Sequence, residues 1–575
     1  MERIGVFLCH CKLIPPIDTG RVFEAIGNKP GVVYAADYEE MCMAPGLERV
    51  KEAIKDEKLD GVVLTSCSPA LYEETFRHIV TSAGLEGYQM VVAELKGQDG
   101  AKEATQRAIE AIESALERLR MSRPTVSSRV PITKRALVIG GGIAGIQASL
   151  DIADAGYEVI LVEKTPSIGG RMIQLSETFP TLDCPQCIET PKMTDTGQHP
   201  NIKILAYSEV EGVSGNIGKF KVKIRRKAAY VDWDKCNGCG ICQERCATKA
   251  LAEFQQYLDL PGKIAHRKAI YIPFAQAVPM RPVIDREHCR YFTKGKCGLC
   301  EMACPVGAID FSQQDSFVEI EVGAIIVATG FDLMPKSEIA EFEEDPDIID
   351  GLEFERLLCP AGPTAGKVIR PSDGREPKEV VFISCCGSRD PEHGVPYCSR
   401  VCCMYLVKHA LLYKHAVPDG QAYIFYMDIR TTGKGYEEFI QRAVEEDKVL
   451  YLRGRVSKVF RDGDKIKVWG SDTLTGKRVE IACDLAVLGM AMLPSEGSKE
   501  LAVKLSIATD EYGFMTELHP KLCPLESTVP GIYLAGCCQG PKDIPDAVAQ
   551  GGGAASKLLS LFSQDEVILE EAAVS

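Results

Sequence analysis

Four cysteines with the spacing C-x2-C-x2-C-x3-C constrain this chain more than any other feature, and a related group of four follows them. Short loops of this kind wrap three thiolates around one iron-sulfur cubane, while the fourth cysteine reaches a neighbouring cluster in two-cluster ferredoxins. A four-thiolate zinc site is the alternative, but it rarely needs a third and a fourth cysteine at these offsets. The spacing therefore predicts two [4Fe-4S] clusters in an inserted ferredoxin domain over residues 236–314. The expected ligands are Cys236, Cys239, Cys242 and Cys304 for one cluster, and Cys246, Cys289, Cys297 and Cys300 for the other.

The composition of the whole chain agrees with a metal or redox protein. It has 24 cysteines in 575 residues, and its N-terminus lacks the basic and apolar pattern of an export signal. Cytosolic thiols would reduce a disulfide framework of this size. The formal charge of −15, with acidic residues scattered along the chain, disfavours nucleic acid and anionic membranes as partners. No stretch reaches the ~18 apolar residues of a spanning helix, so we expect a cytoplasmic protein.

The first 123 residues are predicted to form a separate α/β domain, because a chain of this length exceeds a single core. Apolar strands alternate with helical patterns, which favours a small parallel sheet. Residues 99–120 are rich in helix formers, and residues 121–131 have the composition of a linker. The expected strands are residues 4–8, 32–36, 61–65 and 90–93.

Four cysteines of this domain lie near the predicted strand ends. The carboxyl ends of parallel strands share one edge, where ligands bind. A [4Fe-4S] cluster is therefore one interpretation, and ordinary packing of small apolar residues is the other. The candidate ligands are Cys9, Cys11, Cys42 and Cys67.

A second α/β unit opens with a glycine-rich turn directly after the strand ALVI. Gly140, Gly142 and Gly145 fit G-x-G-x-x-G, and Glu163 closes the next strand about twenty residues later. The glycines let the backbone approach a pyrophosphate, the helix N-terminus faces its charge, and the carboxylate can bond ribose hydroxyls. We therefore predict a dinucleotide site, with Ile143, Ala144 and Lys164 as further contacts.

Three more segments resemble the two-dinucleotide-binding flavoproteins, the thioredoxin reductase and glutamate synthase relatives. They are SIGGR at 167–171, VATG ending at 330, and GIYLAGCCQGPKDIPDAVAQGGGAA from 531. The resemblance implies FAD within a domain made of residues 130–235 and 315–575. That family usually has Asp where this chain has Cys537. The implied FAD contacts are Gly170, Arg171, Ala328, Thr329, Gly330, Gly536, Cys537, Asp543, Ile544 and Ala547.

A block of five cysteines follows the strand VVFIS, where the flavoprotein relatives carry a second glycine fingerprint for NAD(P)H. The block contains Cys385, Cys386, Cys398, Cys402 and Cys403. Residues 350–483 are therefore interpreted as a degenerate nicotinamide domain that holds one cluster; the alternative is that these cysteines pack in a core. A separate C-x2-C, Cys184 and Cys187, could be structural, a redox pair or part of a cluster, and we leave it unassigned.

Taken together, these motifs resemble the A-type subunit of heterodisulfide reductase over nearly the whole chain. The resemblance rests on CHC near the N-terminus, SCSP, the flavin fingerprint, DCPQCIETPKM, the ferredoxin insert, YCSRVCCMYLVKHA and AGCCQGPKDIPDAVAQ. It implies that Cys385, Cys398, Cys402 and Cys403 bind the cluster of the block, with Cys386 beside it, and that Lys408 tunes the flavin. One difference is that long members carry a further ferredoxin module after the flavin domain, which is not found before residue 575.

The family implies an FAD and iron-sulfur protein of anaerobic complexes, several of which bifurcate electron pairs. The expected partners are B- and C-like subunits, a hydrogenase- or formate dehydrogenase-like donor and ferredoxin, with the chain as a homodimer in a larger complex. The alternatives are an NAD(P)H:acceptor oxidoreductase of the glutamate synthase small-subunit type, the flavin subunit of a quinone-linked membrane complex, and a scaffold with structural clusters. Cofactor chemistry rather than side-chain acid-base chemistry is expected in the leading hypothesis.

Overall fold

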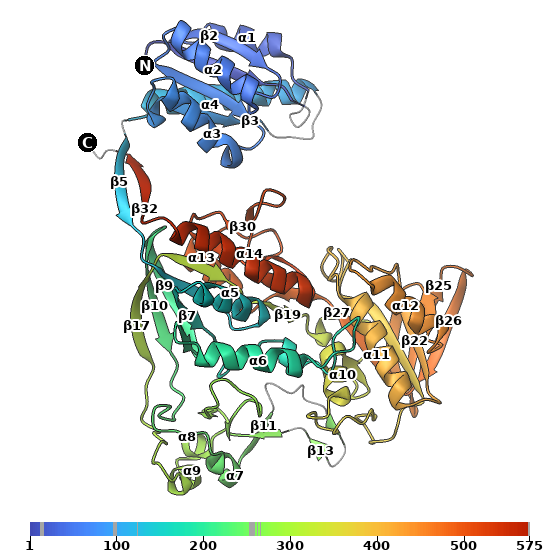
Figure 1. Cartoon of the computed structure of the whole chain (residues 1–575). Coiled ribbons are helices and arrows are strands. Elements are labelled where there is room, and N and C mark those ends of the chain that lie inside the picture. The colour runs from blue at the N-terminus through green and yellow to red at the C-terminus, as the bar shows by residue number, and fades with distance from the viewer. Residues whose placement is uncertain are drawn as a thin grey trace. The chain divides into compact units, whose positions relative to one another are not determined.

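The structure is a computed structural model that describes residues 1–11, 16–95, 101–123, 125–251, 259–260, 263–264 and 266–572 (Figure 1). The chain divides into two compact units. The first contains Met1–Val130 with Leu518–Pro524 and Glu566–Ser575, and the second contains Pro131–Glu517 with Leu525–Asp565. No helix in the described part of the chain is both long enough and apolar enough to cross a membrane.

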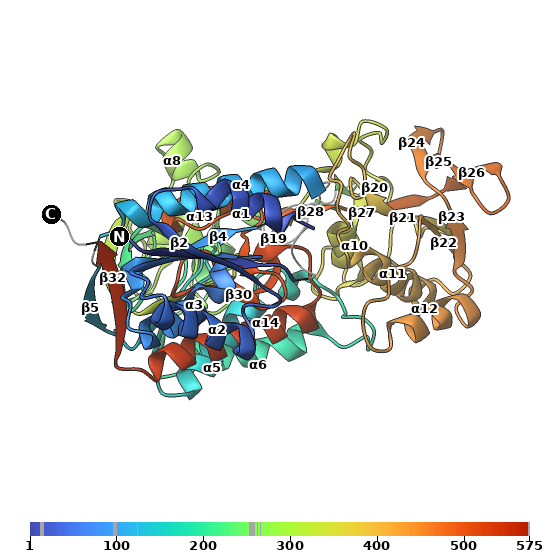
Figure 2. The ribbon, with the colours of Figure 1, turned by 90° about the horizontal axis from the view of Figure 1, so that it is seen from above.

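The first unit is an α/β domain around a four-stranded parallel sheet of order β2-β1-β3-β4. All residues of β1 and β3 are buried, as expected for strands covered on both faces. Figure 2 shows α1 and α4 on one face of the sheet and α2 and α3 on the other. The strand predictions and the helix prediction for residues 101–120 are confirmed; residues 99 and 100 lie outside the described residues. The elements are β1 (Ile4–Cys9), α1 (Thr19–Gly27), β2 (Val32–Tyr38), α2 (Ala44–Asp56), β3 (Gly61–Ser66), α3 (Pro69–Ser82), η1 (Gly87–Gln89), β4 (Met90–Glu94) and α4 (Ala101–Met121).

The segment with linker composition contains a strand instead. β5 (Thr125–Pro131) pairs with β32 (Glu566–Ala572) in a two-stranded sheet. Arg129 and Glu566 form an ion pair across it at 2.5 Å. The partner strand lies more than 400 residues away in sequence, so local composition does not reveal the pairing.

The second unit contains a seven-stranded sheet of order β29-β30-β31-β18-β6-β7-β8. The central strands β31, β18, β6, β7 and β8 are parallel, and α5 packs against α14 beside them. A parallel sheet whose central strand leads into a glycine turn and α5 is the arrangement expected for the predicted dinucleotide-binding domain. Its elements are β6 (Arg135–Ile139), α5 (Ile143–Asp154), β7 (Glu158–Val162), η2 (Met172–Gln174), α6 (Pro185–Gln198), β8 (Ile202–Leu205), β18 (Ala324–Val327), α13 (Ser498–Leu505), β29 (Glu517–His519), β30 (Cys523–Ser527), β31 (Ile532–Leu534), η4 (Gly536–Gln539) and α14 (Ile544–Phe562).

The cysteine-rich insert is connected at both ends to a three-stranded antiparallel sheet, β17-β10-β9. Arg226 at the end of β10 pairs with Ser316 at the start of β17, so both ends of the insert leave from adjacent backbone positions. The insert has three short helices around a small core, which Figure 1 shows beyond the ends of β10 and β17. Its elements and supporting strands are β9 (Ser208–Asn216), β10 (Lys219–Arg226), α7 (Ile241–Arg245), β11 (Lys249–Leu251), β12 (Asp259–Leu260), β13 (Lys263–Ile264), β14 (His266–Lys268), β15 (Ile270–Tyr271), β16 (Val283–Ile284), α8 (Arg290–Lys294), α9 (Leu299–Ala303) and β17 (Ser316–Val322).

The third part of this unit is a five-stranded parallel sheet of order β20-β27-β21-β22-β23, with a three-stranded antiparallel sheet, β24-β25-β26, beside it. α10, α11 and α12 pack on the parallel sheet through a large apolar core. The elements are β19 (Phe331–Leu333), η3 (Lys336–Glu338), β20 (Ile348–Asp350), α10 (Gly351–Leu358), β21 (Glu379–Cys386), α11 (Cys402–Ala416), β22 (Gln421–Tyr426), α12 (Tyr436–Glu445), β23 (Leu450–Arg453), β24 (Val456–Asp462), β25 (Lys465–Asp472), β26 (Lys477–Cys483), β27 (Leu485–Met490) and β28 (Met492–Pro494).

Candidate flavin and iron-sulfur sites

The glycine fingerprint forms a tight turn between β6 and α5. Gly140 has φ +107°, and a Cβ there would lie 2.3 Å from the carbonyl oxygen of Ala328 on the neighbouring strand end. A Cβ at Gly145 would lie 1.9 Å from the carbonyl oxygen of Gly140. Gly142 is the N-cap of α5 and supplies no side chain to the first N–H groups of the helix. These N–H donors and the positive end of the helix dipole suit an anionic pyrophosphate.

Glu163 holds this turn in place from the end of β7. Its carboxylate accepts hydrogen bonds from the backbone N–H of Gly141, at 2.7 Å, and from the N–H and hydroxyl of Thr165, both at 2.8 Å. The side chain is buried. The carboxylate predicted to meet a ribose therefore also organises the turn itself.

The other predicted flavin segments converge on the same edge of the sheet. A Cβ at Gly170 would lie 2.9 Å from the Cα of Gly142, and a Cβ at Gly536 would lie 3.0 Å from the Cβ of Ala144. Asp543 is the N-cap of α14 and accepts a 2.8 Å hydrogen bond from the hydroxyl of Tyr436. The geometry thus brings together the glycine turn, the SIGGR loop and the start of α14, and this donor-lined cradle fits a dinucleotide.

Of the remaining predicted contacts, Ala328, Thr329 and Gly330 follow β18, and Thr329 has a buried hydroxyl oxygen with no hydrogen-bond partner. Arg171 pairs with Asp332 and lies 5.8 Å from the ring centre of Phe331. Cys537 is buried and its thiol donates to the carbonyl of Lys542 at 3.5 Å. The other four candidates lie at the start of a helix or after β7. Ile143 begins α5, Ile544 and Ala547 lie in the first turns of α14, and Lys164 directly follows Glu163.

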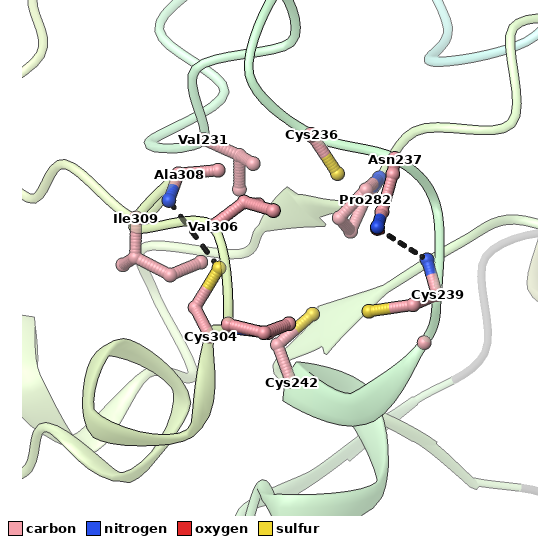
Figure 3. Close-up of a pocket in the computed structure, with 12 residues that line it drawn as sticks. Val231, Cys236, Asn237, Cys239, Cys242, Pro282, Cys304, Val306, Ala308 and Ile309 are labelled. Carbon is pink, nitrogen blue, oxygen red and sulfur yellow. Dashed lines mark hydrogen bonds between the residues drawn. The ribbon is translucent and has the colours of Figure 1, made fainter.

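Four cysteines of the insert surround one pocket, as Figure 3 shows. Cys236, Cys239 and Cys242 come from the loop and start of α7, and Cys304 comes from the end of α9. Backbone N–H groups donate to the sulfurs of Cys236, at 3.4 Å, and Cys304, at 3.3 Å. Apolar side chains, among them Ile309, form much of the remaining wall. This is the first predicted ligand set. Its members come from two segments that lie near opposite ends of the insert in sequence.

The second predicted set also comes together in the insert. Burial, together with the nearby Cys289 and Cys246, raises the pKa of the Cys300 thiol to about 12. Cys246 and Cys297 likewise act on Cys289, whose pKa is raised mainly by burial. The fourth cysteine of each motif therefore reaches the other set, as in two-cluster ferredoxins. Within the described residues, no group of three or more Cys, His, Asp or Glu side chains is arranged to hold a metal ion.

The five-cysteine block contains three thiols that interact, a fourth in the adjoining loop and one cysteine that turns away. Cys402, at the start of α11, forms hydrogen bonds with Cys385 and Cys403, which lower the pKa of both, that of Cys403 to about 7. Cys398 accepts a 3.3 Å hydrogen bond from the backbone N–H of Arg400. Cys386 points into the core, where its thiol donates to the carbonyl of Ile383 at 3.2 Å.

Two arginines adjoin this block, and motif reasoning missed both of them. Arg389 acts electrostatically on Cys385 and Cys398 while forming an ion pair with Asp428. Arg400 pairs with Asp546 in the first turn of α14. Arg400 thus links a cysteine loop to a flavin-domain helix, a connection that depends on the fold and has no local sequence signal.

Lys408 lies in a fully buried charge network on α11. Its Nζ pairs with Glu355 of α10 and donates to the carbonyl of Glu177 at 2.7 Å, and His409 Nε2 lies 2.7 Å from the same Glu355 oxygen. Burial alone would raise the pKa of Glu355, but Lys408 and His409 hold it well below its usual range. Glu355 also accepts hydrogen bonds from the N–H and hydroxyl of Ser176, at 2.8 and 2.6 Å, in the loop that follows η2. The family resemblance was the only sequence signal for Lys408, and Glu355 had none.

The cysteines of the first unit also gather at one sheet edge. Burial raises the pKa of Cys9 to about 12, with Cys11 and Cys42 contributing, and Cys67 interacts with the same two residues. Cys9 ends β1 and Cys67 follows β3 directly, but Cys42 lies four residues past the end of β2, in the turn before α2. Tyr72, which follows the SCSP motif of the family resemblance, hydrogen-bonds to Cys42.

Comparisons with known proteins agree with these two kinds of site. Residues 136–230 match the family model described as FAD dependent oxidoreductase, and residues 229–251 match the 4Fe-4S binding domain. FAD and [4Fe-4S] clusters are therefore the cofactor classes. Among solved structures, thioredoxin reductase of T. acidophilum is similar with a TM-score of 0.42 and 14% identity, over 75% of this chain and 100% of that chain.

Curated relatives match nearly the whole chain. The A-type subunit of the H(2):CoB-CoM heterodisulfide,ferredoxin reductase of Methanothermobacter thermautotrophicus is 45% identical over 99% of this chain and 86% of its own length. The first of two A-type iron-sulfur subunits of the CoB--CoM heterodisulfide reductase of Methanopyrus kandleri is 46% identical over 99% of this chain and 86% of its own length. The A-type subunit of the ferredoxin/F(420)H(2)-dependent CoB-CoM heterodisulfide reductase of Methanosarcina acetivorans is 40% identical over 98% of this chain and 71% of its own length.

Proposed function

Because the chain belongs to the family of A-type heterodisulfide reductase subunits, we propose that it converts between paired and single electrons in a cytoplasmic complex. It is an oxidoreductase. When bound, FAD accepts electrons in pairs or singly, whereas each cluster carries one electron at a time. The chain's own residues bind these cofactors, set their electrostatic surroundings and hold them within one chain.

The proposal assigns four clusters to the chain. Two belong to the insert. One uses the four cysteines around the pocket in Figure 3, and the other uses Cys300 with Cys246, Cys289 and Cys297. A third belongs to Cys385, Cys398, Cys402 and Cys403, and a fourth to Cys9, Cys11, Cys42 and Cys67. The support is that each set of thiols gathers within one fold although its members come from different elements.

The proposed FAD site lies along the edge of the seven-stranded sheet. The N–H groups at the start of α5 would face the pyrophosphate, Glu163 would orient the turn, and the start of α14 would lie near the flavin end. Lys408 would act on the flavin through the Glu355 network rather than as an isolated charge.

The proposed electron donor is a partner protein rather than NAD(P)H. In the strand-to-helix connection after β21, a glycine fingerprint is replaced by Cys385 and Cys386, and this favours a cluster over a nicotinamide there. The printed names of the relatives include H(2), formate and ferredoxin. We therefore assign a hydrogenase- or formate dehydrogenase-like donor, B- and C-like subunits and ferredoxin as partners of a homodimer, with bifurcation of electron pairs as the coupled reaction.

The observation that carries this proposal is the convergence of Cys236, Cys239, Cys242 and Cys304 on one pocket, in a chain that also has the glycine turn of a flavoprotein. The test is anaerobic purification of the native complex, followed by measurement of iron, sulfide and flavin and identification of the other subunits. We expect one FAD and about sixteen iron atoms per chain. Colourless protein, or rapid flavin reduction by NADH or NADPH with the isolated chain, would contradict the proposal.

A further inference from the structure

Cys184 and Cys187 form a solvent-exposed pair that the proposed electron path does not use. Cys184 is the N-cap of α6, Pro185 follows in the first turn, and both cysteines are exposed. The backbone N–H of Cys187 donates to the Cys184 sulfur at 3.3 Å. The two side chains also hydrogen-bond to each other, so their sulfurs already lie close together.

The chain before this pair is anchored to buried parts of the second unit. Ser176 bonds to Glu355, and Phe179 stacks edge-on against Tyr436, with ring centres 5.5 Å apart. After Cys184, Gln186 donates to the carbonyl of Ile173 in η2, at 3.3 Å. The pair thus stands at a defined position at the end of a packed loop, and both sulfurs can be reached from solvent.

The local electrostatics make the two sulfurs unequal. The hydrogen bond to Cys184 raises the pKa of the Cys187 thiol. The Cys184 sulfur faces the backbone N–H of Cys187 and lies at the N-terminus of α6, the positive end of its dipole. A thiolate beside a thiol in C-x2-C is the arrangement that supports thiol-disulfide exchange.

We propose that Cys184 and Cys187 are a redox-active dithiol that is oxidised to an intramolecular disulfide by low-molecular-weight disulfides. The Cys184 thiolate attacks one sulfur of the small disulfide, which forms a mixed disulfide and releases one thiolate. The Cys187 sulfur, after losing its proton, then attacks the Cys184 sulfur and releases the second thiol. Two protein thiols and one small disulfide become one protein disulfide and two small thiols, so the small disulfide is the only oxidant needed.

A tryptic peptide isolates the pair for the test. Cleavage after Arg171 and Lys192 gives residues 172–192, which contain no other cysteine, lysine or arginine before the cleavage site. Anaerobic full-length protein is equilibrated with mixtures of reduced and oxidised dithiothreitol, quenched with acid, alkylated and digested. We expect peptide 172–192 to be two hydrogens lighter and unalkylated in oxidised samples. Each tenfold rise in the ratio of oxidised to reduced dithiothreitol should raise its disulfide-to-dithiol ratio tenfold.

Variants assign the roles of the two sulfurs. In Cys187→Ser, oxidised glutathione should leave a stable mixed disulfide on Cys184, whereas Cys184→Ser should react at least tenfold more slowly at Cys187. Gln186→Ala keeps both thiols and is the matched control, which should still oxidise reversibly. Flavin and iron contents equal to those of the unmodified chain show that the variants are folded.

Three outcomes would overturn the inference. The peptide could stay a dithiol at every dithiothreitol ratio, or react with alkylating agent only after a chelator removes a metal. It could also form disulfides only with other cysteines of the chain.

Discussion

The ferredoxin insert and the cysteine block after β21 hold similar thiols in different ways. In the insert, each set takes three cysteines from one segment, with one of them in a short helix, and the fourth from the helix end of the other segment. In the block, Cys385 lies near the end of a buried strand with φ +62°, Cys398 lies in a loop and Cys402 begins a helix. The comparison teaches that a repeated C-x2-C loop identifies a site by its local motif, whereas ligands held by a strand, a loop and a helix depend on the packing of the surrounding domain.

Replacing one cluster ligand in each region is expected to give the largest difference between the insert and the block. Cys239→Ser should lower the iron content by about four atoms per chain and remove one cluster signal from the electron paramagnetic resonance spectrum. FAD and the thermal stability of the flavin domain should stay, because paired β10 and β17 hold the insert at its base. Cys385→Ser should remove as much iron and also lower the melting temperature, because Cys385 is buried near the end of a central strand. Equal stability of the two variants would remove the distinction.

Lys408→Met tests whether iron binding by the cysteine block depends on the stability of the domain around it. Removing Lys408 leaves Glu355 buried without its lysine partner, which should cost about 3–5 kcal/mol of unfolding free energy. Because Lys408 and Cys402 lie on the same helix, the block should lose iron before the insert does. Lys414→Met on that helix is the control, since Lys414 is partly exposed, and should change stability far less. Urea unfolding with iron analysis measures both.

The same network should give the flavin-containing unit a pH dependence. The pKa of Glu355 is lower in the folded chain than its ordinary value of 4.5, so its stabilising contribution is complete above that value and is lost as the pH falls below it. The slope of unfolding free energy against pH in that acidic range should flatten in Lys408→Met. An unchanged slope would show that Glu355 does not carry the effect.

Glu163→Gln should weaken FAD binding without lowering the iron content of either cysteine region. The amide loses part of the acceptor capacity used by Gly141 and Thr165, so FAD affinity should fall roughly tenfold. Glu158→Gln, an exposed carboxylate on the same strand, is the control and should leave it unchanged. Flavin release on dilution measures the affinity, and loss of iron along with FAD would contradict the separation of the sites.

The smallest expected effect concerns the fifth cysteine of the block. Cys386→Ala removes a buried sulfur that packs as a small apolar group, which should cost about 1 kcal/mol and no iron. Loss of about four iron atoms, measured by iron analysis, would mean that Cys386, rather than Cys385, is a ligand.

The sequence predicted those features whose causes are local. Strand and helix patterns located β1, β3, β4 and α4, and cysteine spacing grouped the insert. The strand β5 was taken for a linker because its partner, β32, lies at the far end of the chain. Cys385 and Cys386 are adjacent in sequence, and only the backbone turn at Cys385 sends their side chains to different surroundings. Glu355 gave no signal because a buried carboxylate is recognised only by the cations that the fold brings to it.

The adjacency of Arg226 and Ser316 makes the ferredoxin insert separable in principle from its host. A short reverse turn could replace residues 227–315 and close β10 and β17 into an ordinary hairpin without altering the register of the flavin sheet. Genetic gain or loss of such a module requires compatible backbone geometry at this junction and a substitute for the hydrogen bonds that Val278 forms with Ser167 and Ile168. With these two conditions met, the number of electron carriers in a lineage can change while its nucleotide-binding scaffold persists.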